Sequence, residues 1–102
     1  MRDLLILGDG IHGREMADLV ARVNAVRPTW NLLGRVAPSE GWDARPDALV
    51  IPDNAWPDTL PVPRDRLATL VDPSVFVASG ARIGPGCVLY PHGFVGADAV
   101  LG

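Results

Sequence analysis

The chain of 102 residues contains no lysine and a single cysteine, Cys87. Its nine basic residues are all arginines spread along the sequence, while twelve acidic residues give a net charge of −3. Because no run of basic residues could follow a phosphate backbone, we expect no nucleic-acid partner. One cysteine cannot form an internal disulfide, which agrees with a reducing compartment.

Long hydrophobic runs are absent near the N-terminus. The apolar run there spans residues 4–7 and ends at Gly8, which is far short of a signal-peptide core or a membrane span. We therefore expect a cytoplasmic protein without a membrane partner. The 48% of hydrophobic and 21% of charged residues are typical of a folded globular protein.

The N-terminal part of the chain shows the pattern of a strand, a glycine-rich loop, a helix and a second strand. A buried parallel strand is predicted over residues 3–8. A helix is predicted over residues 14–26, because apolar residues recur there at helical spacing: Met16, Leu19, Val20, Val23 and Val26. Pro28 ends this helix, and residues 31–36 predict the second strand. Residues 3–36 therefore predict a βαβ unit with a right-handed crossover.

The middle of the chain is rich in proline. Residues 37–46 contain two prolines and no helical periodicity, which predicts a loop, and residues 48–51 predict a third strand. The loop has no room for a crossover helix, so the direction of the third strand stays open. An extended linker is indicated by Pro57, Pro61 and Pro63. We place one domain at residues 1–60 and a second at residues 61–102.

The last third of the sequence has a period of six residues. Branched aliphatic residues recur at this spacing: Val71, Val77, Ile83, Leu89, Val95 and Leu101. Mostly small residues stand four places after each of the first five: Val75, Ala81, Cys87, Gly93 and Ala99. Such hexads are typical of parallel β-helices, in which each hexad forms one side of a triangular coil with its aliphatic residue inside. Cys87 is then a core thiol rather than a nucleophile.

The predicted fold class is α/β, with a small Rossmann-like βαβ N-terminal domain followed by the start of a left-handed parallel β-helix. Five hexads and the opening of a sixth amount to fewer than two coils. Stacked repeats need about three units or more to stand alone. We therefore expect the sequence to be part of a longer protein.

Together the two halves resemble a family of sugar acyltransferases that includes sialic acid O-acetyltransferases and UDP-4-amino-sugar N-acetyltransferases. The resemblance covers most of the chain and is weakest over residues 37–66. It is carried by residues 5–18, Leu33-Gly34, residues 68–75 and residues 81–86.

The resemblance implies a homotrimer in which the N-terminal domain holds a sugar nucleotide and acetyl-CoA lies along the β-helix between subunits. It also implies a histidine on the β-helix as general base, because the acceptor amine or hydroxyl must lose a proton while it attacks the thioester. In the family this histidine lies in a His-Asp-Cys-like segment. No such segment occurs before Gly102, so we expect the base to lie beyond it.

A substrate site is predicted around the glycine-rich loop and after the third strand. Its predicted residues are Gly8, Asp9, Gly10, Ile11, His12, Gly13, Arg14, Asp53 and Asn54. The spacing Gly-x-Gly-x-x-Gly before a helix favours an anion site, and we interpret it as a nucleotide-sugar loop. A dinucleotide loop and a tight turn without ligand remain alternatives. A dinucleotide site would need an acidic residue after the second strand, where the chain has Val36, Ala37 and Pro38. Many of the acyltransferases also carry an aspartate there, so the contacts to base or ribose stay open.

Each polar candidate also has a purely structural interpretation. His12 could contact the substrate or cap the helix, and Arg14 could contact a phosphate or face solvent. Asp53 and Asn54 follow the third strand at the usual ligand side of a parallel sheet, but they also suit a turn, which we favour. The β-helix carries one histidine, His92, as a weak catalytic candidate. It stands one place later in its hexad than the family's histidine, which fits a corner residue facing solvent or a neighbouring subunit.

Three functions follow from these patterns. The first is the N-terminal part of an acetyl-CoA-dependent acyltransferase that acts on an amine or hydroxyl of a nucleotide-linked or free sugar, without a metal, and that is expected to be inactive as this fragment because its base lies beyond Gly102. The second is a non-catalytic module for sugar-nucleotide binding or assembly, and the third is a fragment of a nicotinamide-dependent enzyme.

The three tryptophans are predicted to pack over the sheet or in a subunit contact: Trp30, Trp42 and Trp56.

Overall fold

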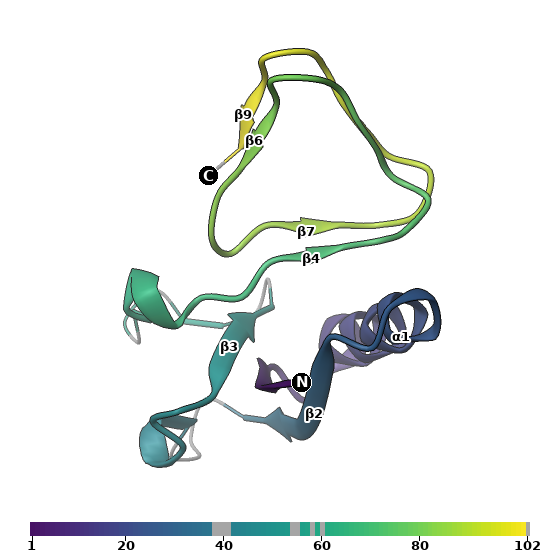
Figure 1. The fold of residues 1–102 in the computed structure, drawn as a ribbon. Helices are drawn as coiled ribbons and strands as arrows, with labels where there is room; N and C mark the ends of the chain where they lie inside the picture. Colours follow the sequence, from purple (N-terminus) through teal and green to yellow (C-terminus); the bar gives the residue numbers. More distant parts are fainter. Residues whose placement is uncertain (38–41, 54–55, 58, 60, 102) are drawn as a thin grey trace.

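The computed structural model describes residues 1–37, 42–53, 56–57, 59 and 61–101. In Figure 1 a sheet with one helix lies next to a triangular coil of short strands. The N-terminus lies in the sheet and the chain ends in the coil.

The sheet contains three parallel strands in the order β2-β1-β3. Strand β1 (Arg2–Leu7) leads into helix α1 (Ile11–Val26), which returns to β2 (Trp30–Val36). A 3-10 turn, η1 (Trp42–Ala44), precedes β3 (Leu49–Pro52). The third strand is thus parallel to β1, although its connection contains no α-helix in the described residues.

Helix α1 begins within the glycine-rich loop, three residues before the predicted start. It buries one face against the sheet through Met16, Leu19 and Val20, the spacing of an amphipathic helix. The turn into β2 is fastened by Asn24, whose Nδ2 donates to the carbonyl of Trp30 at 2.8 Å. Its Oδ1 accepts the N–H groups of Thr29 and Trp30, each at 3.0 Å.

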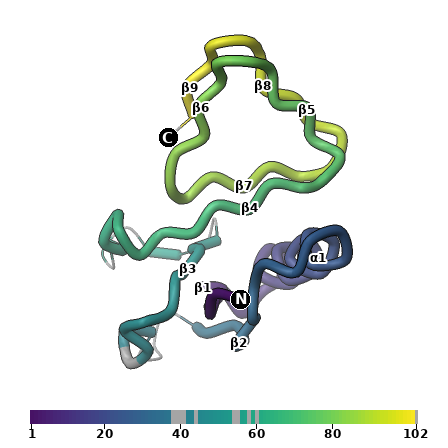
Figure 2. The backbone as a smooth tube through the Cα atoms, in the orientation of Figure 1, coloured from purple at the N-terminus to yellow at the C-terminus, as the bar shows by residue number. Residues whose placement is uncertain are grey.

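The coil contains six strands of two residues each. They are β4 (Leu70–Val71), β5 (Phe76–Val77), β6 (Arg82–Ile83), β7 (Val88–Leu89), β8 (Phe94–Val95) and β9 (Val100–Leu101). Each pairs in parallel with the strand 18 residues away, giving the pairs β4-β7, β5-β8 and β6-β9. Figure 2 shows the two passes of the chain lying along the same three sides. The residues of the six-residue period form the second position of every strand.

Most interior and exterior positions of the coil follow this period. Val95 is buried, whereas Phe76 and Phe94, which pair in register, face outward and are 60% and 78% exposed. Val77 was predicted in the interior but is 43% exposed. It pairs in register with Val95 of β8, which is buried.

A single apolar cluster joins the sheet, the helix and the coil. Leu4 and Ile6 of β1 and the buried face of α1 pack together with Ala68 and Leu70, and Val88 of β7 packs against them. The chain enters the coil beside β3, because the N–H of Ala68 donates to the carbonyl of Val50 at 2.8 Å. The coil therefore rests on the sheet and α1 through buried side chains.

In the described part of the chain, the opposite face of the sheet is covered by loops and 3-10 turns rather than by an α-helix. Leu5, Leu7 and Val50 pack there with Trp42 and Trp56, whose rings meet edge to face with centroids 6.5 Å apart. The guanidinium of Arg66, in the 3-10 turn η2 (Arg64–Arg66), lies 5.3 Å from the centre of the Trp42 ring. Packing of these two tryptophans over the sheet agrees with the prediction.

The predicted fold class, a Rossmann-like domain followed by the start of a left-handed parallel β-helix, is wrong. The described residues contain one α-helix and many short strands in parallel sheets of two or three strands. A Rossmann-like sheet has helices on both faces, whereas here loops and a 3-10 turn cover one face. The physical reason lies in residues 37–46, whose prolines and irregular apolar pattern cannot support a second helix.

Among the described residues, no helix is long and apolar enough to cross a membrane.

Candidate functional site

A cleft of about 370 Å³ lies where β1 and β3 end, between the start of α1 and the coil. The sheet and helix contribute His12, Glu15, Met16, Pro52 and Asp53. The coil contributes Gly86, Val88 and Tyr90. The carboxyl ends of parallel strands are the usual ligand side of such a sheet, so the position of this cleft agrees with a binding site.

His12 and Glu15 form a pair on the first turn of α1. Nδ1 of His12 lies 3.5 Å from Oε1 of Glu15, and the two side chains are 52% and 57% exposed. Residues three apart on a helix share one face, so both side chains reach the cleft. The carboxylate can orient the imidazole and leave Nε2 for a ligand.

Asp53 lies against the glycine-rich loop from the end of β3. A Cβ atom placed on Gly8 would overlap the Asp53 carboxylate. The backbone N–H of Asp53 donates to the carbonyl of Leu7 at 3.0 Å, which holds the residue next to the end of β1. Gly8 is therefore needed to admit a carboxylate.

The other two glycines of the loop have different roles. A Cβ atom on Gly13 would overlap the carbonyl oxygen of Gly8, so Gly13 lets the helix approach the end of β1 closely. Gly10 has open space around it and forms the N-cap of α1. Its carbonyl accepts the N–H of Arg14 and Nη1 of Arg35, each at 3.1 Å.

Tyr90 lines the cleft on the side of the coil. Burial, and then the negative charge of Glu15, raise the pKa of its hydroxyl above the ordinary value. A smaller groove of about 230 Å³ shares Glu15 and Tyr90 with the cleft and continues along α1 toward Arg22.

The structure brings together only part of the predicted site. His12 and Asp53 line the cleft, and the three glycines form the loop beside it. Asp9, Ile11 and Arg14 are exposed and do not line it, and Asn54 lies outside the described residues. Sequence reasoning missed Glu15 and Tyr90. The position of Glu15 one helical turn after His12 was a usable signal, whereas the contribution of Tyr90 depends on how the coil packs on α1.

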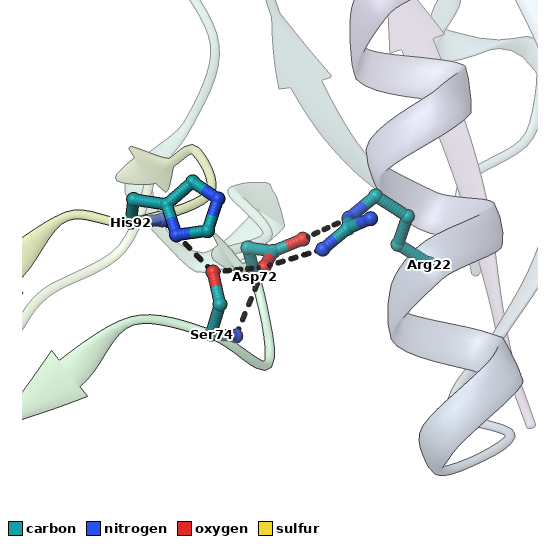
Figure 3. A network of polar contacts seen from close by, with 4 residues as sticks. All are labelled: Arg22, Asp72, Ser74 and His92. Carbon is teal, nitrogen blue, oxygen red and sulfur yellow. Dashed lines mark hydrogen bonds and ion pairs between the residues drawn. The ribbon is translucent and has the colours of Figure 1, made fainter.

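His92 belongs to a different part of the molecule, a polar network between α1 and the coil (Figure 3). Nε and Nη2 of Arg22 donate to the two carboxylate oxygens of Asp72 at 2.5 and 3.2 Å. The N–H and hydroxyl of Ser74 also donate to Asp72, at 2.9 and 2.6 Å. The Ser74 hydroxyl oxygen accepts the backbone N–H of His92 at 2.8 Å.

This network fixes the first corner of the coil. Asp72 is 1% exposed, and hydrogen bonds from Arg22 first, and from Ser74, hold the pKa of its carboxyl far below the usual range despite that burial. His92 has a positive φ of 67° in the corner above Ser74. Its imidazole has no hydrogen-bond partner among the described residues and does not line the cleft. The arrangement gives His92 a structural role through its backbone.

The part of the chain that the structure describes contains no group of three histidine, cysteine or acidic side chains able to hold a metal ion. Cys87 is partly buried in the coil.

No protein-family model matches the chain, and no curated protein or solved structure is significantly similar to it. The resemblance to sugar acyltransferases and the activity that it implies therefore stay predictions.

Proposed function

We propose that the cleft binds a sugar, free or nucleotide-linked, and that the chain takes part in acyl transfer from acetyl-CoA to an amine or hydroxyl of that sugar. The observation that carries the proposal is the meeting of His12, Glu15, Asp53 and Tyr90 in one cleft at the carboxyl ends of parallel strands.

The chemistry of the cleft suits a polyhydroxylated ligand. The carboxylates of Glu15 and Asp53 accept hydrogen bonds, which sugar hydroxyls donate, while the Tyr90 hydroxyl both donates and accepts. Met16 and Val88 supply apolar wall for the faces of a sugar ring. A few convergent polar groups on a partly apolar surface are typical of small-molecule sites.

Acyl transfer also needs a base, and His12 is better placed for this role than His92. The acceptor must lose a proton as it attacks the thioester, and the base must lie within hydrogen-bond reach of it. His12 lines the cleft and has a carboxylate beside Nδ1. Neutral imidazole could then take the proton on Nε2, while Glu15 stabilises the resulting cation.

A homotrimer remains part of the proposal. It is supported by the apolar side chains on the outer surface of the coil, where Phe76, Phe94 and Val100 are 60%, 78% and 73% exposed. Such surfaces often mark contacts between proteins.

The test combines binding and turnover. Calorimetric titration of the chain with glucosamine, UDP-glucosamine, acetyl-CoA and NADH reports binding, and release of the coenzyme A thiol reports transfer. We expect at least one sugar to bind and His12→Ala to weaken that binding or abolish transfer, while the matched variant His92→Ala leaves both unchanged. Binding of NADH alone would overturn the proposal.

A second candidate is a sugar-binding module without catalysis. It is favoured by the exposure of His12 and Glu15, each more than half exposed, because an active site usually excludes water from its base. Sugar binding without thiol release in the presence of acetyl-CoA would select this second function.

A further inference from the structure

The glycine-rich loop of the cleft is occupied by a carboxylate of the protein itself. In phosphate-binding loops the glycines let backbone N–H groups approach the anion. Here the space next to Gly8 is filled by the Asp53 side chain. A phosphate at this loop would have to approach the negative charge of Asp53, whose backbone N–H is anchored to the carbonyl of Leu7.

The remaining charges of the cleft have the same sign. Glu15 and Asp53 give it two carboxylates, and no arginine lines it among the described residues. Arg35 uses Nη1 to bind the carbonyl of Gly10, and Arg14 is exposed on the first turn of α1. Neither arginine lines the cleft, so among the described residues His12 is the one basic side chain that lines it.

The hydroxyl of Tyr90 lies within the field of the same carboxylate. Its pKa is raised first by burial and then by the charge of Glu15.

We propose that Asp53 and Glu15 make the cleft selective for a protonated amine, so that its ligand is a free amino sugar rather than a sugar carrying phosphate. This inference rests on the proposed function, since it presumes that a sugar binds there. It assigns Asp53 and Glu15 as the residues that determine specificity: both attract the ammonium group, and Asp53 keeps phosphate away from the loop.

The test uses three related probes, glucosamine, glucose and glucosamine 6-phosphate, titrated by calorimetry at low salt and about pH 7, where most of a sugar amine is protonated. Glucosamine is expected to bind about 10-fold more tightly than glucose, the range of a charge-assisted hydrogen bond. Glucosamine 6-phosphate should bind more weakly than glucosamine.

Two variants and one control assign the selectivity to its residues. Asp53→Asn and Glu15→Gln should each lower the ratio of glucosamine to glucose affinity several-fold, and Asp53→Asn should also reduce the discrimination against the phosphate. Glu15 lies on the exposed surface of α1, so Glu15→Gln tests the idea even if Asp53→Asn fails to fold. Asp47→Asn, an exposed carboxylate outside the cleft, should retain the wild-type ratio.

Equal affinities for glucosamine and glucose, or tighter binding of the phosphate, would overturn this inference and leave sugar binding intact. Failure of all three probes to bind would contradict the proposed function itself.

Discussion

The loop between β1 and α1 depends on close approaches that only glycine permits at two positions. Gly8 makes room for the Asp53 carboxylate, and Gly13 makes room for the Gly8 carbonyl, while Gly10 has open space. The three glycines are alike in sequence but differ in what a side chain would meet. This difference can be measured.

Gly13→Ala is expected to destabilise the fold by about 2 kcal/mol or more, because the new methyl group would overlap backbone and α1 would have to move away from β1. The gain of about 1 kcal/mol from replacing glycine by alanine within a helix is too small to offset this. Gly10→Ala is the matched control. Its effect should stay below about 1 kcal/mol, since only the N-cap preference changes. Urea unfolding measures both, and similar losses would contradict the steric explanation.

Asp72 is a second residue whose role can be tested, here through pH. Its carboxyl has a lowered pKa in the folded state, so the folded protein keeps the charge at pH values where the unfolded chain binds a proton. The stability that this provides is complete above the unfolded pKa of about 3.9 and is lost as the pH falls below it.

Asp72→Asn should therefore lower the melting temperature by about 5 °C or more at pH 7, and the difference from wild type should shrink below about pH 4. Thermal unfolding followed by circular dichroism at pH 7, 5 and 3 gives this comparison. Asp65→Asn, at an exposed carboxylate, serves as the control and should change little at any pH. A difference for Asp72→Asn that is as large at pH 3 as at pH 7 would refute the assignment.

At the level of elements, the coil and the sheet with α1 share buried side chains and a polar connection. Leu70 belongs to the apolar cluster of β1 and α1, and Arg22 of α1 holds Asp72 just after β4. We therefore expect the two parts to unfold together. The predicted division into residues 1–60 and 61–102 has not been tested, and this expectation provides the test.

Val95→Ala removes a buried side chain from β8 and should cost about 2 kcal/mol. Trp30, Trp42 and Trp56 all lie outside the coil, so tryptophan fluorescence reports the sheet and α1, whereas far-ultraviolet circular dichroism reports the whole chain. Both transitions should move to lower denaturant by the same amount. An unchanged fluorescence transition would show two independently stable parts.

Most individual elements could be predicted from local patterns. Helical spacing predicted α1 to within three residues, and the six-residue period placed the second residue of each coil strand correctly. The six-residue period does not indicate which outer face of the coil packs on the sheet. Val88 precedes the interior residue Leu89 in β7 and therefore points away from the interior of the coil, and there it packs against the shared apolar cluster. The fold class was wrong because one βαβ unit was taken to indicate a Rossmann-like sheet, although residues 37–46 predict a loop in place of a second helix.

In the candidate site, too, individual residues could be predicted from local patterns, whereas their contacts could not. His12 and Asp53 could be found because each follows a strand end, where ligands usually bind. The sequence could not show that the Asp53 side chain fills the space beside Gly8. That contact arises because β3 lies next to β1 in the sheet, and the order of the strands cannot be read from local patterns. Tyr90 lies 75 residues after Glu15 in the chain and reaches it only through the packing of the coil on α1.

At the scale of the whole molecule, the cleft lies between the sheet, α1 and the coil. The end of β3, the start of α1 and the coil each contribute to it, so the cleft exists only when the coil is packed in place. Binding at the cleft should therefore stabilise the contact between the coil and α1.

The central claim, that this cleft binds a sugar, is tested most directly by nuclear magnetic resonance. Two-dimensional spectra of the amide groups, recorded while glucosamine is added, report where the ligand contacts the chain. We predict that the largest changes in amide chemical shift occur at His12, Glu15, Asp53 and Tyr90. The amide chemical shifts of Phe76 and Phe94 on the outer coil should not change. Shifts confined to the outer coil, or no shifts at millimolar sugar, would contradict it.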